Sequence, residues 1–216
     1  MDCCQCQGIE LQFTRGRAAK QLAQYRQKGA AGTTRTLVDA LVTLGLEGST
    51  LLDVGGGVGA VQYELLQAGA SRATSVEASS AYLSVAQEET DRQGLGDRIT
   101  FRQGDFVVLA PDLPDADIVT LDRVICCYHD MLALVGLSAA KARRLYGVVY
   151  PRDSWWVKGV LWLQNRWYSL RRNPFRVFAH ETASVDASIR SNGLRPRFAR
   201  ETLVWQVVVY AREAPA

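Results

Sequence analysis

The chain has 216 residues, of which 48% are hydrophobic, and a formal net charge of +3. This length and composition suffice for one hydrophobic core, and the nearly balanced charge gives no argument for a nucleic-acid partner. No apolar run reaches the roughly 18 residues that a membrane span needs, and no secretory signal is recognisable. We therefore expect one domain over 1–216 with a cytoplasmic location.

Two helices are predicted ahead of any strand, over 14–27 and 34–44. Thr33 or Thr34 is the expected N-cap of the second helix, because a threonine hydroxyl can accept from the free amides of a first turn. The expected parts of the domain are a helical lid (1–48), a core (49–153 and 181–213) and an insertion (154–180).

The most informative segment is an apolar strand followed by a glycine-rich turn. Residues 49–54 are predicted to form a buried parallel strand, and a helix is predicted over 58–69. Between them lies the turn Gly55-Gly56-Gly57-Val58-Gly59, which follows Asp53. Glycines adopt positive φ and let a ligand approach the backbone, and the following helix offers its N-terminal amides. The segment therefore predicts a site for a nucleotide-like cofactor.

Three further strands lead to an acidic residue or a Gly-Asp pair. Open α/β sheets bind ligands at the carboxyl edge of their strands, so these side chains are expected to converge near the glycine turn. Taken singly, each acid is equally well explained as a helix cap or a solvated loop charge. The predicted strands cover 72–77, 99–106 and 117–121, and the residues at their ends are Glu77, then Gly104, Asp105 and Phe106, then Asp122.

The order of the remaining elements predicts a doubly wound α/β fold. Helices follow the second and fourth strands, and two strands close the chain as an antiparallel hairpin, which gives a mostly parallel, seven-stranded sheet. The predicted helices cover 79–93, 131–144 and 184–192, and the remaining strands cover 145–150, 198–202 and 203–211.

Two cofactor classes use a turn of this kind. Gly55, Gly57 and Ala60 fit the dinucleotide fingerprint G-x-G-x-x-G/A, which leaves a nicotinamide or flavin enzyme open. Asp53 favours S-adenosyl-L-methionine, because a carboxylate there would repel a pyrophosphate and attract the ammonium and sulfonium of that cofactor. The run from Asp53 to Gly59 resembles the D-x-G-x-G-x-G signature of class I S-adenosylmethionine-dependent methyltransferases.

The resemblance implies a Rossmann-like methyltransferase fold and a role for each residue at a strand end. It implies that Glu77 binds both ribose hydroxyls, that Asp105 accepts from the adenine amino group, and that Phe106 lies beside the ring. The implied cofactor-binding residues are Asp53, Gly55, Gly57, Gly59, Glu77, Gly104, Asp105, Phe106 and Asp122, and no metal ligand is implied.

Beyond the class, the layout after Gly48 is similar to that of magnesium-protoporphyrin O-methyltransferases, including a stretch from Phe175 to His180 behind an aromatic insertion. Two segments depart from that family. Its Ile-His-Tyr-Pro segment reads Ile125-Cys126-Cys127-Tyr128-His129 here, and its tyrosine-phenylalanine pair near the N-terminus reads Gln12-Phe13. The likeness therefore supports methylation more strongly than it supports a porphyrin acceptor.

The insertion holds four of the five tryptophans together with several arginines. Aromatic faces bordered by arginines suit a flat acceptor that carries carboxylates, so the insertion is expected to cap the acceptor site. Two other interpretations stay open: the tryptophans pack over the sheet, or the segment contacts a membrane surface as a basic amphipathic helix. The residues are Trp155, Trp156, Trp162, Trp167, Arg166, Arg171, Arg172 and Arg176.

Cysteines cluster at two places, at Cys3, Cys4 and Cys6 and at the adjacent pair Cys126 and Cys127. A cytoplasmic location argues against structural disulfides, and a lone C-x-x-C gives little support for a zinc site. One hypothesis is that the N-terminal arm brings its thiols to the pair, where soft thiolates would bind a metalloid or another soft ion. The other hypothesis is that the pair packs as small apolar side chains.

The expected function is methyl transfer from S-adenosylmethionine, by in-line displacement, to an oxygen of a small or medium molecule that is aromatic or carries a carboxylate. His129 lies just past the fourth strand, and the pKa of histidine suits a general base; Tyr128 and Tyr25 are further catalytic candidates. His180 is a candidate substrate contact. The alternatives are cysteine-assisted methylation of a metalloid or thiol, and a partner protein that binds the cofactor without catalysis.

Overall fold

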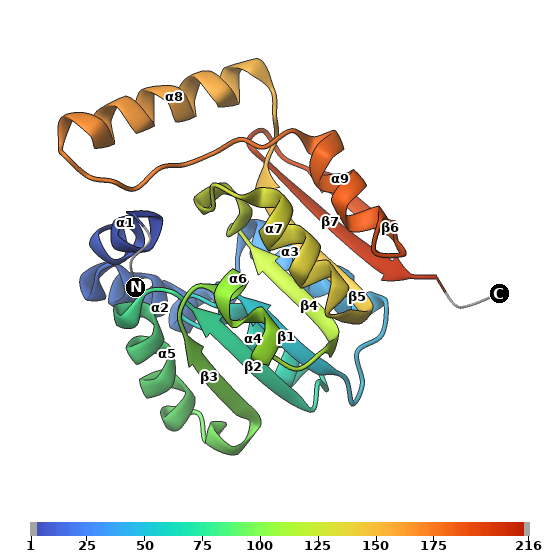
Figure 1. The fold of residues 1–216 in the computed structure, drawn as a ribbon. Helices are drawn as coiled ribbons and strands as arrows, with labels where there is room; N and C mark the ends of the chain where they lie inside the picture. Colours follow the sequence, from blue (N-terminus) through green and yellow to red (C-terminus); the bar gives the residue numbers. More distant parts are fainter. Residues whose placement is uncertain (1–3, 214–216) are drawn as a thin grey trace.

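Residues 4–213 are described by the structure, a computed structural model, with side chains placed from Gly8 onward. Within this range the chain forms one seven-stranded sheet in the order β3-β2-β1-β4-β5-β7-β6 (Figure 1). β1 to β5 run parallel, and β7 runs antiparallel to both β5 and β6, which confirms the predicted fold class. The strands are β1 (Thr50–Val54), β2 (Arg72–Glu77), β3 (Ile99–Gln103), β4 (Ala116–Asp122), β5 (Ala142–Pro151), β6 (Leu194–Glu201) and β7 (Trp205–Arg212).

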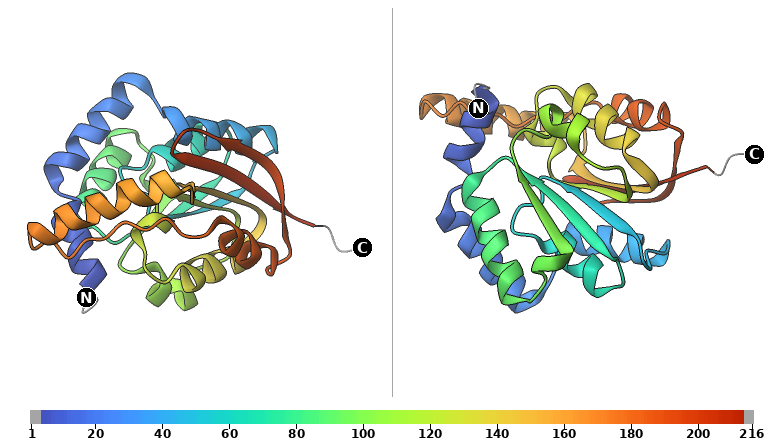
Figure 2. Two further views of the ribbon diagram at one scale, coloured as in Figure 1. Left: turned by 90° about the horizontal axis from the view of Figure 1, so that it is seen from above. Right: turned by 60° about the horizontal axis from the view of Figure 1, so that its bottom comes forward.

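Helices cover both faces of the sheet (Figure 2). Side chains of α3 and α4 pack on one face, where α5 lies beside α4, and those of α6, α7 and α9 pack on the other. Burial from both sides explains why the central strands are almost continuously apolar. These helices are α3 (Gly32–Thr43), α4 (Ala60–Gln67), α5 (Ser80–Arg92), α6 (Phe106–Leu109), α7 (Met131–Ala140) and α9 (Thr182–Arg190).

Gly147 lets α3 approach β5 closely. An added Cβ at this position would lie 2.7 Å from the side chain of Leu37, which is fully buried. The structure therefore places α3 in the helical layer over the sheet rather than in the expected lid over 1–48. Two helices remain for the lid, α1 (Cys4–Gln12) and α2 (Arg15–Lys28), and α2 packs against α5.

Several element boundaries differ from the predictions, and one helix was not predicted. α7 ends at Ala140, four residues before the predicted end, because Ala142 already pairs with Ala116 of β4. β6 begins at Leu194 rather than at 198, and Pro196 is accommodated because β6 is an edge strand with a bulge at this point. α1 is absent from the predictions, since its sequence shows no apolar period.

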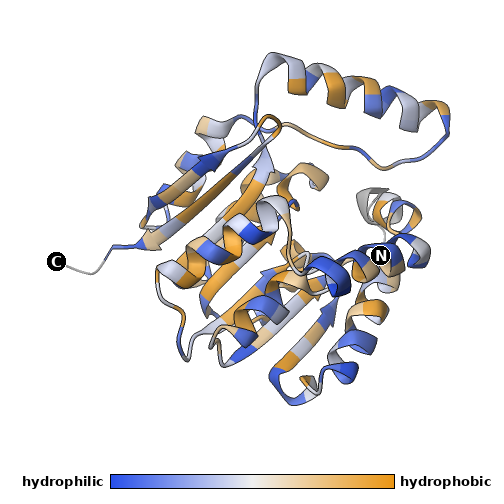
Figure 3. Cartoon of the chain, turned by 180° about the vertical axis from the view of Figure 1, so that it is seen from behind, coloured by the Kyte–Doolittle hydropathy of each residue, from blue (hydrophilic) through white to orange (hydrophobic). Residues whose placement is uncertain are grey.

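The insertion forms a long helix, α8 (Trp155–Leu170), which stands away from the sheet (Figures 1 and 3). Among its residues only Val157 is buried, whereas Trp155 and Trp162 are 85% and 65% exposed. The interpretation that the tryptophans pack over the sheet is therefore wrong. α8 instead forms hydrogen bonds, between Asn165 and Val177, with residues 171–181, which we call the return segment. Within the described residues, no helix combines the length and hydropathy of a membrane span.

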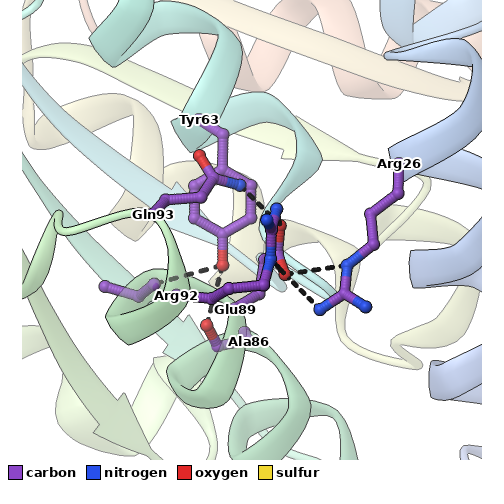
Figure 4. Close-up of polar contacts among 7 residues, drawn as sticks. Arg26, Tyr63, Ala86, Glu89, Arg92 and Gln93 are labelled. Atoms are coloured by element: carbon purple, nitrogen blue, oxygen red, sulfur yellow. Dashed lines mark hydrogen bonds and ion pairs between the residues drawn. The ribbon is translucent and has the colours of Figure 1, made fainter.

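A buried carboxylate ties the lid to the core (Figure 4). Glu89 of α5 is fully buried and accepts hydrogen bonds from Arg26 of α2 and from its neighbours Arg92 and Gln93. The bond from Arg92, helped by those from Arg26 and Gln93, outweighs the effect of burial and lowers the pKa of Glu89 to about 2. The folded protein therefore favours the ionised form of this side chain.

We expect Glu89→Gln to lower the free energy of unfolding by about 2 kcal/mol at neutral pH, less than for a fully buried ion pair because the arginines are half exposed. Because the folded pKa is depressed, this stabilisation exists above the unfolded pKa and is lost as pH falls from about 4.5 to about 2. Denaturant unfolding at several pH values measures it. Glu88→Gln is the matched control, since its ion pair with Arg15 is exposed and screened by solvent, so its loss should change stability little. Equal effects of both variants would contradict the assignment.

Candidate active site

The glycine turn after β1 has the backbone that its sequence predicts. Gly55, Gly57 and Gly59 adopt φ values of 69°, 59° and 91°, a region that other residues rarely occupy. At Gly55 an added Cβ would lie 2.4 Å from the side chain of Val124, so the turn packs against the segment after β4. At Gly57 the nearest atom would be 3.9 Å away, so the backbone there borders open space. Gly59 sits at the start of α4.

Glu77, at the end of β2, is held by backbone amides. Its Oε2 accepts from the amide of Gly57 at 2.9 Å, and its Oε1 accepts from the amide of Ser79 at 2.8 Å. Burial raises the pKa of Glu77, and the amides of Ser79 and Gly57 act in the opposite direction. Each carboxylate oxygen can accept more than one bond, so the side chain retains capacity for ligand hydroxyls. This is the geometry expected of a ribose ligand.

Asp105 and Tyr128 lie together at the end of β3. Asp105 caps α6 through the amide of Val107, and the hydroxyl of Tyr128 donates to its carboxylate, 2.8 Å from Oδ2. Gly104, with a φ of 144°, turns the chain at this point, and Phe106 is buried behind it. Tyr128 was a catalytic candidate by sequence position, but its hydroxyl here contacts the residue expected to bind adenine.

Asp53 lies beneath the glycine turn rather than in the main cavity. Its Oδ1 accepts from the hydroxyl of Thr120 at 2.7 Å, while its Oδ2 is buried without a hydrogen-bond partner among the described residues. Burial, with smaller contributions from the charges of Asp122 and Glu77, raises the pKa of Asp53 to about 7. A buried polar atom without a partner is costly, so the geometry suits a ligand that carries positive charge.

A polar cluster that the sequence did not reveal lies at the end of β4. Thr34 of α3 donates to Oδ2 of Asp122 at 2.6 Å, and Arg123 donates to Thr34 at 3.1 Å and to Oδ1 of Asp122 at 3.2 Å. Arg123 has a φ of 61°, a strained value for a residue with a side chain. The sequence offered no signal for this cluster, because the strain at Arg123 is visible only in the structure and Thr34 lies 88 positions before Asp122 in the chain.

These groups surround a cavity of about 310 Å³, within the size range of small-molecule sites. Ile9 of α1 and Phe13, just after it, close the cavity from the lid side, and Arg123 lies at its border with two adjoining hollows. Asp53 lines the smaller of those hollows. The predicted residues that line the main cavity are Gly55, Gly57, Glu77, Gly104, Asp105, Phe106, Asp122 and Tyr128.

Besides Asp53, and Gly59 at the N-cap of α4, three predicted residues do not line the main cavity. His129 is exposed, stacks on Tyr128 at 5.2 Å between ring centroids, and is absent from the lining of the main cavity in the described part of the chain. Tyr25 packs against Tyr63 and lines an adjoining hollow; burial, with the charge of Glu64, raises its pKa. His180 contacts the backbone carbonyls of Ile125 and Tyr128 through Nε2, so it fastens the insertion to the site.

The cysteine pair lies at the edge of the cavity. Cys127 lines it, Cys126 is buried behind, and their Sγ atoms are 3.7 Å apart. The hydrogen bond with Cys127, followed by burial, raises the pKa of Cys126. In the range where side chains are placed, no group of three metal-ligating side chains occurs. Cys3 lies outside the described residues, as do the side chains of Cys4 and Cys6, so the proposed contact with the N-terminal arm stays a hypothesis.

The residues present fit S-adenosyl-L-methionine. Glu77 offers acceptors for ribose hydroxyls, Asp105 offers a carboxylate for the adenine amino group, and the partnerless oxygen of Asp53 faces the turn where a cation would lie. The open space at Gly57 leaves room for a ligand against the backbone, which a Cβ would fill.

Comparison with known proteins agrees with this assignment. Residues 51–145 match the family model described as a methyltransferase domain. The fold is similar to that of magnesium protoporphyrin IX methyltransferase from Synechocystis PCC 6803 with bound S-adenosylhomocysteine, at 20% identity, 90% of this chain, 95% of that chain and a TM-score of 0.65. No curated protein matches the chain by sequence.

Two further structures are similar. A chain of the complex between the Haloferax volcanii Trm112 methyltransferase activator and a putative methyltransferase has 15% identity and a TM-score of 0.69, with 96% of this chain and 99% of that chain covered. The 4+2 cyclase SpnF has 14% identity and a TM-score of 0.64, with 84% and 82% covered. At such identities the likeness shows the fold alone.

The fold alone does not identify the reaction, but the match of residues 51–145 to a methyltransferase domain does. This match agrees with the acidic residues and glycines around the cavity. It confirms S-adenosyl-L-methionine over a dinucleotide as the cofactor. Residues 51–145 therefore match a methyltransferase domain, and the chain has the fold of class I S-adenosylmethionine-dependent methyltransferases.

Proposed function

We propose that this domain transfers the methyl group of S-adenosyl-L-methionine to an oxygen of a small or medium molecule, aromatic or carboxylate-bearing, and that the accepting group is a carboxylate. The observation that carries the proposal is a hollow of about 360 Å³ that adjoins the cofactor site. Arg123 and Lys28 line it, and none of the described residues that line it is acidic. An anionic acceptor would be attracted to such a surface.

The cofactor would lie with adenine at Asp105, ribose at Glu77 and the charged methionine end toward Asp53. When bound it supplies an electrophilic methyl group. This orientation places the methionine end near Arg123, which lines both the hollow beside Asp53 and the hollow proposed for the acceptor.

The protein's contribution is then positioning. A carboxylate is ionised at neutral pH and needs no general base, so the exposed position of His129 is compatible with the reaction. The guanidinium of Arg123 would hold the acceptor, and Asp122 and Thr34 would fix that guanidinium. Holding two reactants in line can provide an effective molarity of about 10⁵ M or more.

The test is methyl transfer from labelled S-adenosylmethionine to a panel of aromatic and aliphatic carboxylic acids, phenols and thiols. We expect a product that releases labelled methanol in mild alkali, because methyl esters hydrolyse there and methyl ethers do not. A product that survives alkali would contradict the carboxylate assignment.

With that acceptor, Arg123→Gln should raise KM at least about tenfold and leave the dissociation constant of S-adenosylhomocysteine within about twofold, because a charged hydrogen bond contributes roughly 1.5–3 kcal/mol. Steady-state kinetics and calorimetry measure the two quantities. Arg200→Gln, an exposed arginine on β6, is the control. An unchanged KM in the Arg123 variant would remove this residue from acceptor binding.

Glu77→Gln should weaken binding of S-adenosylhomocysteine by about tenfold to a hundredfold, since it replaces one acceptor oxygen by a donor that faces the amide of Gly57 or Ser79. Titration calorimetry gives the affinity, and thermal unfolding of the free variant shows whether the fold persists. Glu10→Gln is a suitable control, because Glu10 caps the same loop region through Ser80 outside the cavity lining. Equal affinities for wild type and Glu77→Gln would contradict the ribose assignment.

The raised pKa of Asp53 predicts opposite pH trends for stability and for cofactor affinity. Because the folded protein holds this proton more tightly than the unfolded chain, stability of the free protein falls as pH rises from about 4 toward 7. A cationic ligand favours the carboxylate, so its affinity rises through the same pH region and levels off above 7. Asp53→Asn should flatten both trends and weaken the cofactor about tenfold. Parallel trends in stability and affinity would exclude Asp53 as the group responsible.

A second candidate function is cysteine-assisted methylation of a metalloid or thiol, which the position of Cys127 in the cavity wall favours. The raised pKa of Cys126 opposes it, because the thiolate is the ligand and the nucleophile. Stoichiometric arsenite binding that is lost in Cys127→Ser would favour this function over O-methylation, and failure to bind arsenite would eliminate it.

A further inference from the structure

The outward side of α8 is apolar, the reverse of an ordinary surface helix. Trp155, Trp162, Leu163, Trp167 and Leu170 are all more than half exposed, and we call this set the outer face of α8. Positions 0, 7, 8, 12 and 15 along a helix fall on one side of it, so the five side chains form one continuous stripe. Solvent-exposed apolar patches of this kind mark interaction sites.

Contacts on the opposite side fix this orientation. The hydroxyl of Tyr168 accepts from Gln12 of α1 at 3.0 Å, and Asn165 forms two hydrogen bonds with the backbone of Val177 in the return segment, at 2.8 and 2.9 Å. Val157 is buried beneath the helix. Rolling α8 to hide its outer face would break all of these contacts.

The charge of the insertion indicates what the outer face contacts. Residues 154–180 contain five of the 25 lysines and arginines and none of the 22 aspartates and glutamates of the chain. Four of the five cations are exposed, namely Lys158, Arg166, Arg171 and Arg172, and the guanidinium of Arg171 lies over the ring of Trp167 at 4.3 Å. The remainder of the chain is slightly acidic, so the positive charge of the protein is concentrated on this segment.

We propose that the outer face of α8 binds the surface of an anionic lipid bilayer, with the helix lying in the plane of the interface. Tryptophan rings favour the headgroup level of a membrane, and flanking lysines and arginines attract anionic headgroups while their stems cover apolar surface. This proposal goes beyond the proposed function, since it holds whatever the acceptor is.

A second copy of the chain suits the surface less well. In a symmetric dimer the same patch would meet itself, so the cations of both copies would face one another with no acid from either insertion between them. An anionic membrane relieves this repulsion, whereas a dimer increases it.

Binding of α8 to a bilayer would also affect the active site, because α8 and the return segment contact the end of α1. Tyr168 contacts Gln12, and Phe13 packs on Phe175 of the return segment with ring centroids 5.6 Å apart. Phe13 in turn lines the cofactor cavity. A bilayer bound to α8 would thus act on the contacts that hold α1 and Phe13 against the cofactor cavity.

The experiment is cosedimentation of the whole protein with vesicles of phosphatidylcholine alone or with one third phosphatidylglycerol. Tryptophan emission provides a second readout, since four of the five tryptophans lie in α8. We expect binding to the anionic vesicles, a blue shift of the emission, and a loss of affinity of at least about tenfold at high salt.

Matched variants separate the apolar contribution to vesicle binding from the contribution of the positive charges. Leu163→Ser should reduce vesicle affinity several-fold, whereas Leu132→Ser, at a leucine of similar exposure (62% against 65%) on α7, should not. Lys158→Gln combined with Arg166→Gln should weaken binding to anionic vesicles only, with Arg197→Gln combined with Arg200→Gln on β6 as the control. All these residues are exposed, so each variant should unfold at nearly the temperature of the wild type.

Three outcomes would overturn the proposal. They are no binding to anionic vesicles, equal binding to both vesicle types at all salt concentrations, and a concentration-dependent dimer in solution that Leu163→Ser abolishes while vesicles bind neither protein. Calorimetric binding of S-adenosylhomocysteine without vesicles remains independent of each result, so failure here leaves the cofactor assignment intact.

Discussion

The carboxylate of Glu77 is the constraint on which the site depends. By accepting from the amides of Gly57 and Ser79, it joins the turn after β1 to the turn after β2 and sets the width of the cavity between them. A buried carboxylate would be costly without these donors, and the backbone supplies them because parallel strands bring both turns to one edge of the sheet. Glycine is needed at position 57, since a side chain there would enter the space that the amide of Gly57 borders.

The space around Glu77 and the glycine turn divides into regions of different charge. Asp53 and Asp122 make the end near the glycine turn acidic, which suits the cationic part of the cofactor. Beyond Arg123 the lining becomes basic, which suits an anion. The strained backbone of Arg123 stands at the boundary, held by Thr34 from α3. α3, which the sequence assigns to a lid, thus contributes Thr34 to the boundary between the cofactor site and the proposed acceptor site.

Sequence patterns predicted the fold and the acids at the strand ends because both follow from local order: apolar strands, glycine turns and the shared edge of a parallel sheet. They could not predict contacts between distant segments, such as Tyr128 with Asp105. They also could not choose between Tyr128 and His129, because the two rings stack on each other and the sequence does not show which of them lines the cavity. The direction of α8 depends on Gln12, which is far from it in sequence, and on Val177 in the segment that follows it.

The central claim is the cofactor assignment, and thermal unfolding of the free protein with added ligands tests it most directly. A ligand bound only to the folded state at 100 times its dissociation constant adds about 2.7 kcal/mol to stability. The structure predicts that S-adenosylmethionine and S-adenosylhomocysteine raise the melting temperature while NAD and NADP leave it unchanged. A rise with the dinucleotides alone, or no rise with any of the four, would contradict the account of Asp53, Glu77 and the glycine turn.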